Sequence, residues 1–228
     1  MCECIVQSYS SRFYPAHLGR RPESPSAFEK NAWEIARETS ISANPAPPDP
    51  DRIIRPNHPL TAVMSKDGDL ECLRVRWGWS PVWSMGTRPP LTHLPLEIVM
   101  RSKVFERMRS GGRALVAVDG WFDLARDDSS RDRPVYMRPR FGGPVFLGAL
   151  VQLSESPSGC NGLVLVTTGG GGATGPLQLL AFSGESAGQW LDPTLGWEQA
   201  QELASQSAVQ EPEFEHVAVS DHFLNRSR

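Results

Sequence analysis

Several features that would assign this chain to a broad protein class are scarce or absent. Only four of its 228 residues are cysteine, which is too few for a disulfide-stabilised scaffold of this size. No apolar run approaches the length of about 18 residues that a membrane-spanning helix needs. The formal net charge is −3, whereas dedicated duplex-DNA binders are usually basic overall. The composition leaves open the binding of a short stretch of nucleic acid by a local patch.

The N-terminus also lacks a secretory signal. The opening residues MCECIVQSYSSRF have neither a charged first part nor a long apolar part, so we expect a cytoplasmic protein. A hydrophobic fraction of 39% is typical of a globular chain. The proline-rich stretch at 44–51 comes too early to separate two self-sufficient cores, and we therefore expect a single domain over residues 1–228.

Short runs rich in β-branched residues outnumber the helical patterns. Asp67-Gly68 is a hairpin-turn dipeptide, and it predicts a hairpin over 60–77. On the returning strand of that hairpin, Leu73, Val75 and Trp77 share one face. Further strands are expected within 2–13 and at 113–118, 134–139, 143–153, 162–168 and 216–220, with helices at 25–39, 97–109, 184–191 and 195–207.

This order of elements favours one fold class. The strands are of similar length and few long crossover helices separate them, which argues against a doubly wound parallel sheet. We therefore expect an α+β domain with a mostly antiparallel, curled, barrel-like central sheet and a few peripheral helices.

Several fragments occur together in an order that is typical of one family. Met1-Cys2 opens the chain, WGWSPVW follows at 77–83, DGWFD at 119–123, and VFLGAL at 145–150. As a set, they resemble the SRAP family, the SOS-response-associated proteins that join an N-terminal cysteine to abasic sites in single-stranded DNA. The resemblance implies a peptidase-like protein of the DNA damage response whose partner is single-stranded DNA with abasic sites.

The family's chemistry would begin at Cys2. Removal of Met1 would leave an amine and a thiol on adjacent carbons, which condense with an aldehyde to a thiazolidine ring. Their ordinary pKa values, roughly 8 and about 8.5, leave reactive fractions near pH 7. Opening the sugar and losing water also require a proton shuttle. The plainer interpretation of Cys2 is a small core residue at the start of a strand.

Two further residues fall at catalytic positions of the family. Asp123 stands where the family has its glutamate, and it keeps the carboxylate on a side chain that is shorter by roughly 1.5 Å. His93 stands at the family's asparagine, where an imidazole can hydrogen-bond a sugar or move protons. The alternatives are a solvated turn acid and a loop histidine.

A second group of residues is expected to hold DNA. The resemblance implies that Trp79, Pro81 and Trp83 shape a groove, because aromatic side chains commonly stack on bases of single strands. Glu97 keeps the acid of the family's N-A-R-x-E motif, and Arg101 would supply positive charge. Charged runs such as the one around Arg101 are more often solvated helix faces.

Other family positions are changed. Pro95 and Cys4 replace usual arginines, and Ser84 replaces an aromatic residue. The family's loop histidine is missing, since no histidine occurs between Thr167 and Glu215. Two hypotheses follow: an active cross-linker with associated autopeptidase activity, or a catalytically degenerate member that binds single-stranded DNA or a protein. Whether the chain is an enzyme stays open here.

Two other motifs have weaker interpretations. Gly170, Gly172 and Gly175 match G-x-G-x-x-G, but no βαβ pattern surrounds them and Pro176 fits poorly with a helix start. Cys2-x-Cys4 lacks the second ligand pair of a structural zinc site. We expect no cofactor, no nucleotide, no metal and no membrane partner.

Overall fold

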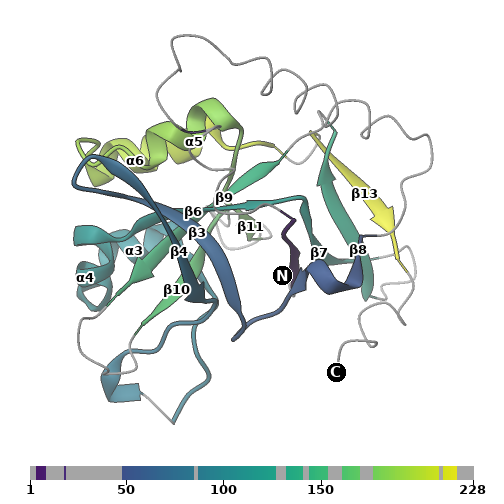
Figure 1. The fold of residues 1–228 in the computed structure, drawn as a ribbon, viewed down its shortest axis with the longest axis horizontal. Coiled ribbons are helices and arrows are strands. Elements are labelled where there is room, and N and C mark those ends of the chain that lie inside the picture. Colours follow the sequence, from purple (N-terminus) through teal and green to yellow (C-terminus); the bar gives the residue numbers. More distant parts are fainter. Residues whose placement is uncertain are drawn as a thin grey trace.

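The computed structural model describes residues 4–8, 18, 48–84, 87–126, 132–140, 144–153, 161–169, 177–210 and 213–219. These residues form two β-sheets and a group of short helices beside the larger sheet (Figure 1). The larger sheet has the strand order β11-β10-β9-β6-β3-β4, with β12 paired to β9 and β5 paired to β10. The smaller sheet has the order β13-β8-β7-β1-β2. All strand pairs are antiparallel except β5 with β10, so the mostly antiparallel α+β class is confirmed.

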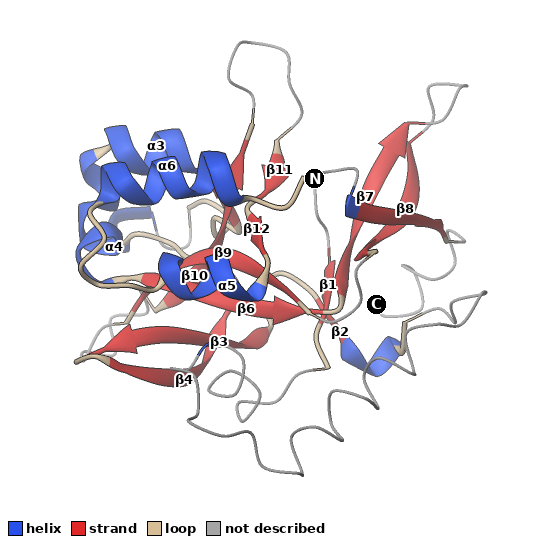
Figure 2. Cartoon of the chain, turned by 90° about the horizontal axis from the view of Figure 1, so that it is seen from above, coloured by secondary structure: helices blue, strands red, loops and turns tan. Residues whose placement is uncertain are grey.

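The elements have the following bounds. The strands are β1 (Cys4–Val6), β2 (Ile53–Ile54), β3 (Pro59–Lys66), β4 (Asp69–Arg76), β5 (His93–Pro95), β6 (Arg113–Val118), β7 (Gly120–Arg126), β8 (Asp132–Pro139), β9 (Val145–Gln152), β10 (Gly162–Thr168), β11 (Gln178–Leu179), β12 (Ala181–Phe182) and β13 (Phe214–Ala218). The helices are α3 (Leu96–Arg101), α4 (Glu106–Gly111), α5 (Gly184–Trp190) and α6 (Trp197–Ser207), with 3-10 turns η1 (Pro50–Arg52), η2 (Val82–Ser84) and η3 (Lys103–Phe105). Figure 2 shows α3, α4, α5 and α6 in blue on one side of the described strands.

The predicted hairpin is confirmed. β3 and β4 pair along their whole lengths, from Pro59 opposite Arg76 to Lys66 opposite Asp69. Both turn residues have positive φ, 53° at Asp67 and 90° at Gly68, which is the backbone shape of the favoured two-residue hairpin turn. The dipeptide therefore sets the register of this edge of the larger sheet.

Two hydrophobic cores lie on opposite faces of the larger sheet. On the helix side, Val164 and Val166 pack with Phe182 and Trp190. On the other side, Trp77, Leu147 and Leu165 pack with Trp121 and Met137 of the smaller sheet. Because β9 and β10 contribute to both cores, their residues are buried almost without interruption, as expected for strands covered on both faces.

The chain passes from one sheet to the other between β6 and β7. Gly120 begins β7 at this point, and a Cβ there would lie 2.2 Å from the carbonyl oxygen of Met137 and 2.8 Å from the Tyr136 ring. A side chain is therefore excluded where the two sheets approach. Because the strands divide at this junction into two open sheets, neither of which closes on itself in the described residues, the expected single barrel-like sheet is not supported.

Other predictions had mixed outcomes. Strands 113–118 and 162–168 match β6 and β10 in both bounds, and the two C-terminal helices are confirmed as α5 and α6. The single helix at 97–109 is wrong, because Ser102 has extended backbone angles (φ −95°, ψ 127°) that end α3 before η3 and α4 begin. β7 is a strand that the sequence did not predict. The expected helix at 25–39 lies outside the described residues.

Among the helices within the described ranges, none combines the length and the apolar character needed to cross a bilayer.

Candidate active site between the sheets

Strand alternation directs Asp123 and His93 into the same inter-sheet space. On β7, Trp121 packs in the inter-sheet core, and Asp123, two residues further, shares its face. On the larger sheet, His93 pairs with Leu165, which packs in that same core. Paired residues on neighbouring strands share a face. The two side chains therefore project toward each other's sheet from strands that are far apart in sequence.

One of the two ring nitrogens of His93 is hydrogen-bonded to a neighbouring residue. The Nδ1 atom shares a hydrogen bond of 3.0 Å with the Thr92 hydroxyl, and the ring meets Trp77 edge-on with centroids 5.5 Å apart. The Trp77 indole donates to the Thr92 carbonyl at 2.9 Å. The Nε2 atom of His93 is buried and has no hydrogen-bond partner among the described residues. Its bonding capacity is open for a substrate group or a water.

Charge and burial both act on the His93 imidazole. Burial, followed by the positive charge of the N-terminal amine, lowers the pKa of His93 to about 4, while the negative charge of Asp123 acts in the opposite direction. The ring is therefore neutral at pH 7, and its open nitrogen can take part in a hydrogen bond.

Asp123 is half-buried in the middle of β7, opposite Val135 of β8. Its Oδ1 atom accepts a hydrogen bond of 2.8 Å from the backbone N–H of Leu124. This bond orients the carboxylate. The alternative interpretation as a turn acid is wrong, because Asp123 lies inside a strand.

Cys2 lies outside the described residues, but the strand that follows it is well defined. β1 runs antiparallel to β7, with Cys4 opposite Phe122 and Val6 opposite Gly120. The chain therefore enters β1 beside the residue that precedes Asp123. Cys4 itself is fully buried with Val6, Phe122 and Tyr136 in an apolar cluster on the far face of the smaller sheet.

The three residues predicted to shape a groove line one pocket of about 220 Å³. Trp79 forms its base: its backbone exchanges two hydrogen bonds with Leu91, of 2.8 and 2.7 Å, and its ring packs against Phe105 at 5.6 Å. Trp83, on η2, is 69% exposed at the rim. Pro81 joins these two aromatic residues. The other lining residues are Ser80, Ser84, Arg88, Pro89, Leu91, Ser102, Val104 and Phe105.

A short segment connects this pocket to His93. Leu91 lines the pocket, and the backbone N–H of Leu165 donates to the carbonyl of Thr92 at 2.9 Å. His93 follows directly as the first residue of β5. One residue of this fixed segment separates Leu91 from His93, but the two lie toward different faces: Trp79 and Phe105 of the pocket pack in the helix-side core, whereas His93 pairs with Leu165 of the inter-sheet core.

The remaining predicted DNA contacts are not part of the pocket. Glu97 is half-buried and Arg101 is exposed, both on α3, and neither lines the pocket. Arg88 is a cation on the pocket wall that the sequence did not single out. Its position becomes evident only when the 77–83 segment folds beside 88–91.

Thr167 is a second residue that sequence reasoning missed. It is 2% exposed and pairs with Pro95 of β5, and its hydroxyl has no hydrogen-bond partner in the part of the chain that the structure describes. Two residues beyond Leu165 on β10, it faces the same inter-sheet space as His93. A threonine at the end of an apolar strand is a weak signal, and only the pairing of β5 with β10 reveals it.

The described residues contain no group of three or more His, Cys, Asp or Glu side chains that could hold an ion. The glycines of the G-x-G-x-x-G match lie outside the described residues.

Sequence comparison identifies relatives along most of the chain. Residues 19–225 match the model of the family SOS response associated peptidase (SRAP). The abasic site processing protein YedK of Escherichia coli (strain K12) is 25% identical over 182 residues, which are 76% of this chain and 81% of that protein.

Solved structures share the fold at lower identity. A phage-related protein from Bordetella bronchiseptica superposes with a TM-score of 0.68 at 21% identity, over 96% of this chain and 95% of the other. A protein from Bacteroides thetaiotaomicron gives a TM-score of 0.68 at 15% identity, over 99% and 95%. At these identities the likeness concerns the fold alone.

Proposed function

The chain belongs to the SOS response associated peptidase (SRAP) family, and from this premise we propose that it processes abasic sites in single-stranded DNA by a covalent link through Cys2. A relative of known name, YedK, is an abasic site processing protein. The proposal extends that role to this chain on the basis of its inter-sheet site.

The proposed reaction is a condensation that releases one water. Once Met1 is removed, the Cys2 amine attacks the aldehyde carbon of the ring-opened sugar, and the resulting carbinolamine loses water to give a Schiff base. The thiol then adds to the imine carbon, its proton passes to the nitrogen, and a thiazolidine ring closes. Asp123 would donate and accept the protons of sugar opening and water loss, with the neutral His93 imidazole as a second acceptor.

The position of His93 and Asp123 on facing strands is the observation that carries this proposal. His93 pairs with Leu165 of the inter-sheet core, and Asp123 shares the face of Trp121, which packs in the same core. The negative charge of Asp123 also acts to raise the pKa of His93. This supports a site where imidazole and carboxylate lie within reach of one sugar.

Chain connectivity gives independent support. Consecutive Cα atoms are about 3.8 Å apart, so the Cα atom of Cys2 lies within about 7.6 Å of that of Cys4. Cys4 is paired with Phe122, the residue before Asp123. The N-terminal residues therefore enter the smaller sheet next to the strand that carries Asp123.

The Trp79–Trp83 pocket would hold a base next to the abasic site. Its wall is mainly apolar, and Trp83 presents an exposed ring. Arg88 on the same wall supplies a positive charge that would suit a DNA phosphate. Stacking on such side chains is tolerant of sequence, which suits a protein that must act wherever a base is lost.

An adduct assay tests the proposal. Protein with Met1 removed, as verified by its mass, is incubated with single-stranded DNA carrying one abasic site, beside Cys2→Ala. We expect a heat-stable band whose mass equals protein plus DNA minus one water, and no band with the variant. Folded protein with a free Cys2 that forms no such band over a long incubation contradicts the proposal.

The same groups would support hydrolysis of the bond between Met1 and Cys2. In this step Asp123 would activate water for attack on the carbonyl carbon of Met1, and the Cys2 amine would leave with a proton. Mass spectrometry of the N-terminus over time, with the wild type beside Asp123→Asn, separates self-processing from removal by other enzymes.

A second candidate function has specific support. Cys4, at a usual family arginine, is fully buried in an apolar cluster, and Pro95, at another, forms part of β5. Two expected phosphate contacts are therefore missing. These changes favour a member that binds single-stranded DNA, or a protein, without efficient chemistry. Tight binding of intact single-stranded DNA together with no adduct would support this alternative.

A further inference from the structure

The chain leaves β1 through a residue whose side chain ties the two sheets together. The Nε2 atom of Gln7 donates to the carbonyl oxygens of Thr61 in β3 and Ala117 in β6, at 2.9 and 3.0 Å. Its Oε1 atom accepts from the backbone N–H of Thr61 at 2.9 Å. These partners are backbone atoms of the larger sheet, whereas β1 belongs to the smaller sheet. One amide group therefore bridges the sheets directly after the N-terminal strand.

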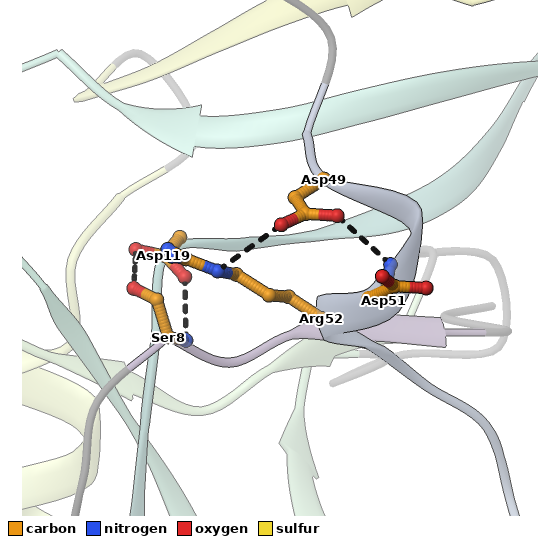
Figure 3. Close-up of polar contacts among 5 residues, drawn as sticks. All are labelled: Ser8, Asp49, Asp51, Arg52 and Asp119. Carbon is orange, nitrogen blue, oxygen red and sulfur yellow. Dashed lines mark hydrogen bonds and ion pairs between the residues drawn. The ribbon is translucent and has the colours of Figure 1, made fainter.

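The next residue is fixed by a carboxylate at the sheet junction. Ser8 donates to both oxygens of Asp119, from its backbone N–H at 2.9 Å and from its hydroxyl at 2.7 Å, as Figure 3 shows. The backbone N–H of Asp119 in turn donates to the carbonyl of Val6 at 2.9 Å. Hydrogen bonds to an ionised acceptor are among the stronger ones in proteins, so this pair is a specific anchor.

The 3-10 turn η1, which Asp49 caps, contacts the chain just after β1. Asp49 accepts from the backbone N–H of Asp51 at 3.0 Å and pairs with the Arg52 guanidinium at 3.5 Å (Figure 3). The turn presents the Arg52 carbonyl to the backbone N–H of Gln7 at 3.0 Å. It then continues into β2, which pairs with Ile5 and Val6.

These bonds matter because β1 is too short to specify its own register. It has three residues, and a slip by one residue would move it by about 3.3 Å and turn every side chain to the opposite face. Such a slip would also displace the residues before Cys4. Displacements near 1 Å can cost catalysis about a hundredfold.

We propose that Gln7, together with the Ser8–Asp119 pair, is a register lock that positions the reactive N-terminus. Cys2 lies five residues before Gln7 in the sequence, and the lock holds β1 at the register that sets Cys4 opposite Phe122, the neighbour of Asp123. Gln7 itself touches no substrate. The role in chemistry rests on the proposed function of Cys2, whereas the lock is a property of the fold that can be measured separately.

The test uses Gln7→Leu, which keeps the size of the side chain and removes its hydrogen bonds. Its control is Val164→Ala, a truncation in the fully buried core on the helix side, which lowers stability without touching the junction. We expect Gln7→Leu to lower the adduct rate at saturating DNA by about 10- to 100-fold while the DNA concentration for half-maximal rate stays unchanged. Amides of β1 should exchange with deuterium faster in Gln7→Leu than in the control.

A pair of variants at Asp119 guards against misfolding of Gln7→Leu. Asp119→Asn keeps an acceptor for Ser8 and should retain most of the rate, whereas Asp119→Ala should lose as much as Gln7→Leu. If the β1 amides of Gln7→Leu exchange with deuterium no faster than those of the control, the register lock is contradicted. Faster exchange with a wild-type rate at saturation overturns its positioning role. A wild-type protein that forms no adduct contradicts the proposed function instead, and β1 exchange then decides the lock alone.

Discussion

The two sheets are held in place by different forces. In the larger sheet, β9 and β10 are buried on both faces by apolar side chains, and this burial favours the fold over many residues at once. In the smaller sheet, β1 and β2 have only three and two residues. β1 is buried as well, and hydrogen bonds of Gln7 and of Asp119 to Ser8 add polar contacts directly after it. The comparison teaches that apolar burial stabilises the molecule, while a few polar bonds place the strand that leads to the proposed chemistry. Changes in the two sheets should therefore separate stability from activity.

The largest loss of activity without a loss of stability is expected for Asp123→Asn in the smaller sheet. Loss of the proton-transferring carboxylate should lower the adduct rate by about 10²- to 10⁴-fold, with little change in melting temperature because the side chain is only half-buried. Asp123→Glu is the matched control, since it keeps the acid and lengthens its reach. A rate for Asp123→Glu as low as that of Asp123→Asn would count against proton transfer at this position.

The opposite pattern is expected for Phe146→Ala in the larger sheet. Phe146 is 1% exposed in the helix-side core, and truncation of a buried phenylalanine costs about 3–5 kcal/mol. Urea unfolding should show this loss, while the adduct rate per folded molecule stays at the wild-type value. If the folded variant reacts much more slowly, stability and activity are not separable in the way the two sheets suggest.

The free energy of unfolding should depend on pH through His93. Because the pKa of His93 is lowered to about 4 in the folded protein, the unfolded chain takes up its proton first as the pH falls. The stabilisation is thus complete above about pH 6.5 and is lost progressively down to about pH 4, by an amount of about 3 kcal/mol. Unfolding free energies measured over this range should fall less steeply for His93→Asn. Parallel curves for the two proteins would mean that His93 titrates normally.

The smallest effect is expected at the rim of the pocket. Trp83→Ala should weaken the binding of intact single-stranded DNA by about 1–3 kcal/mol and leave stability unchanged, because the ring is 69% exposed. Leu153→Ala removes another exposed apolar side chain, 53% exposed, away from the pocket. If both variants bind single-stranded DNA equally well, the pocket does not contact the DNA.

Much of the larger sheet could be predicted from the sequence. β6 and β10 match their predicted bounds because they are continuous runs of β-branched and aliphatic residues, a pattern that doubly covered strands require. The hairpin of β3 and β4 follows from one turn dipeptide. These elements are local, so short windows of sequence contain the information.

The smaller sheet and the site were harder to predict because their signals are not local. β7 starts at Gly120, directly after Asp119, and this dipeptide resembles a turn. Only the pairing with β1 and β8 makes the segment a strand. His93 meets the inter-sheet space because β5 runs parallel to β10, about 70 residues later, and no periodic pattern encodes that pairing. The break at Ser102 was missed because apolar spacing continues on both sides of it.

The central claim is that the N-terminal amine, His93 and Asp123 form one coupled site, and an NMR titration of His93 tests it most directly. The pKa of His93 would be followed in the wild type, in Asp123→Asn, and in protein whose N-terminal amine has been acetylated. The account predicts a lower pKa in Asp123→Asn, where the favourable carboxylate is lost, and a higher pKa after acetylation, where the repelling charge is removed. A His93 pKa that is the same in all three proteins would contradict it.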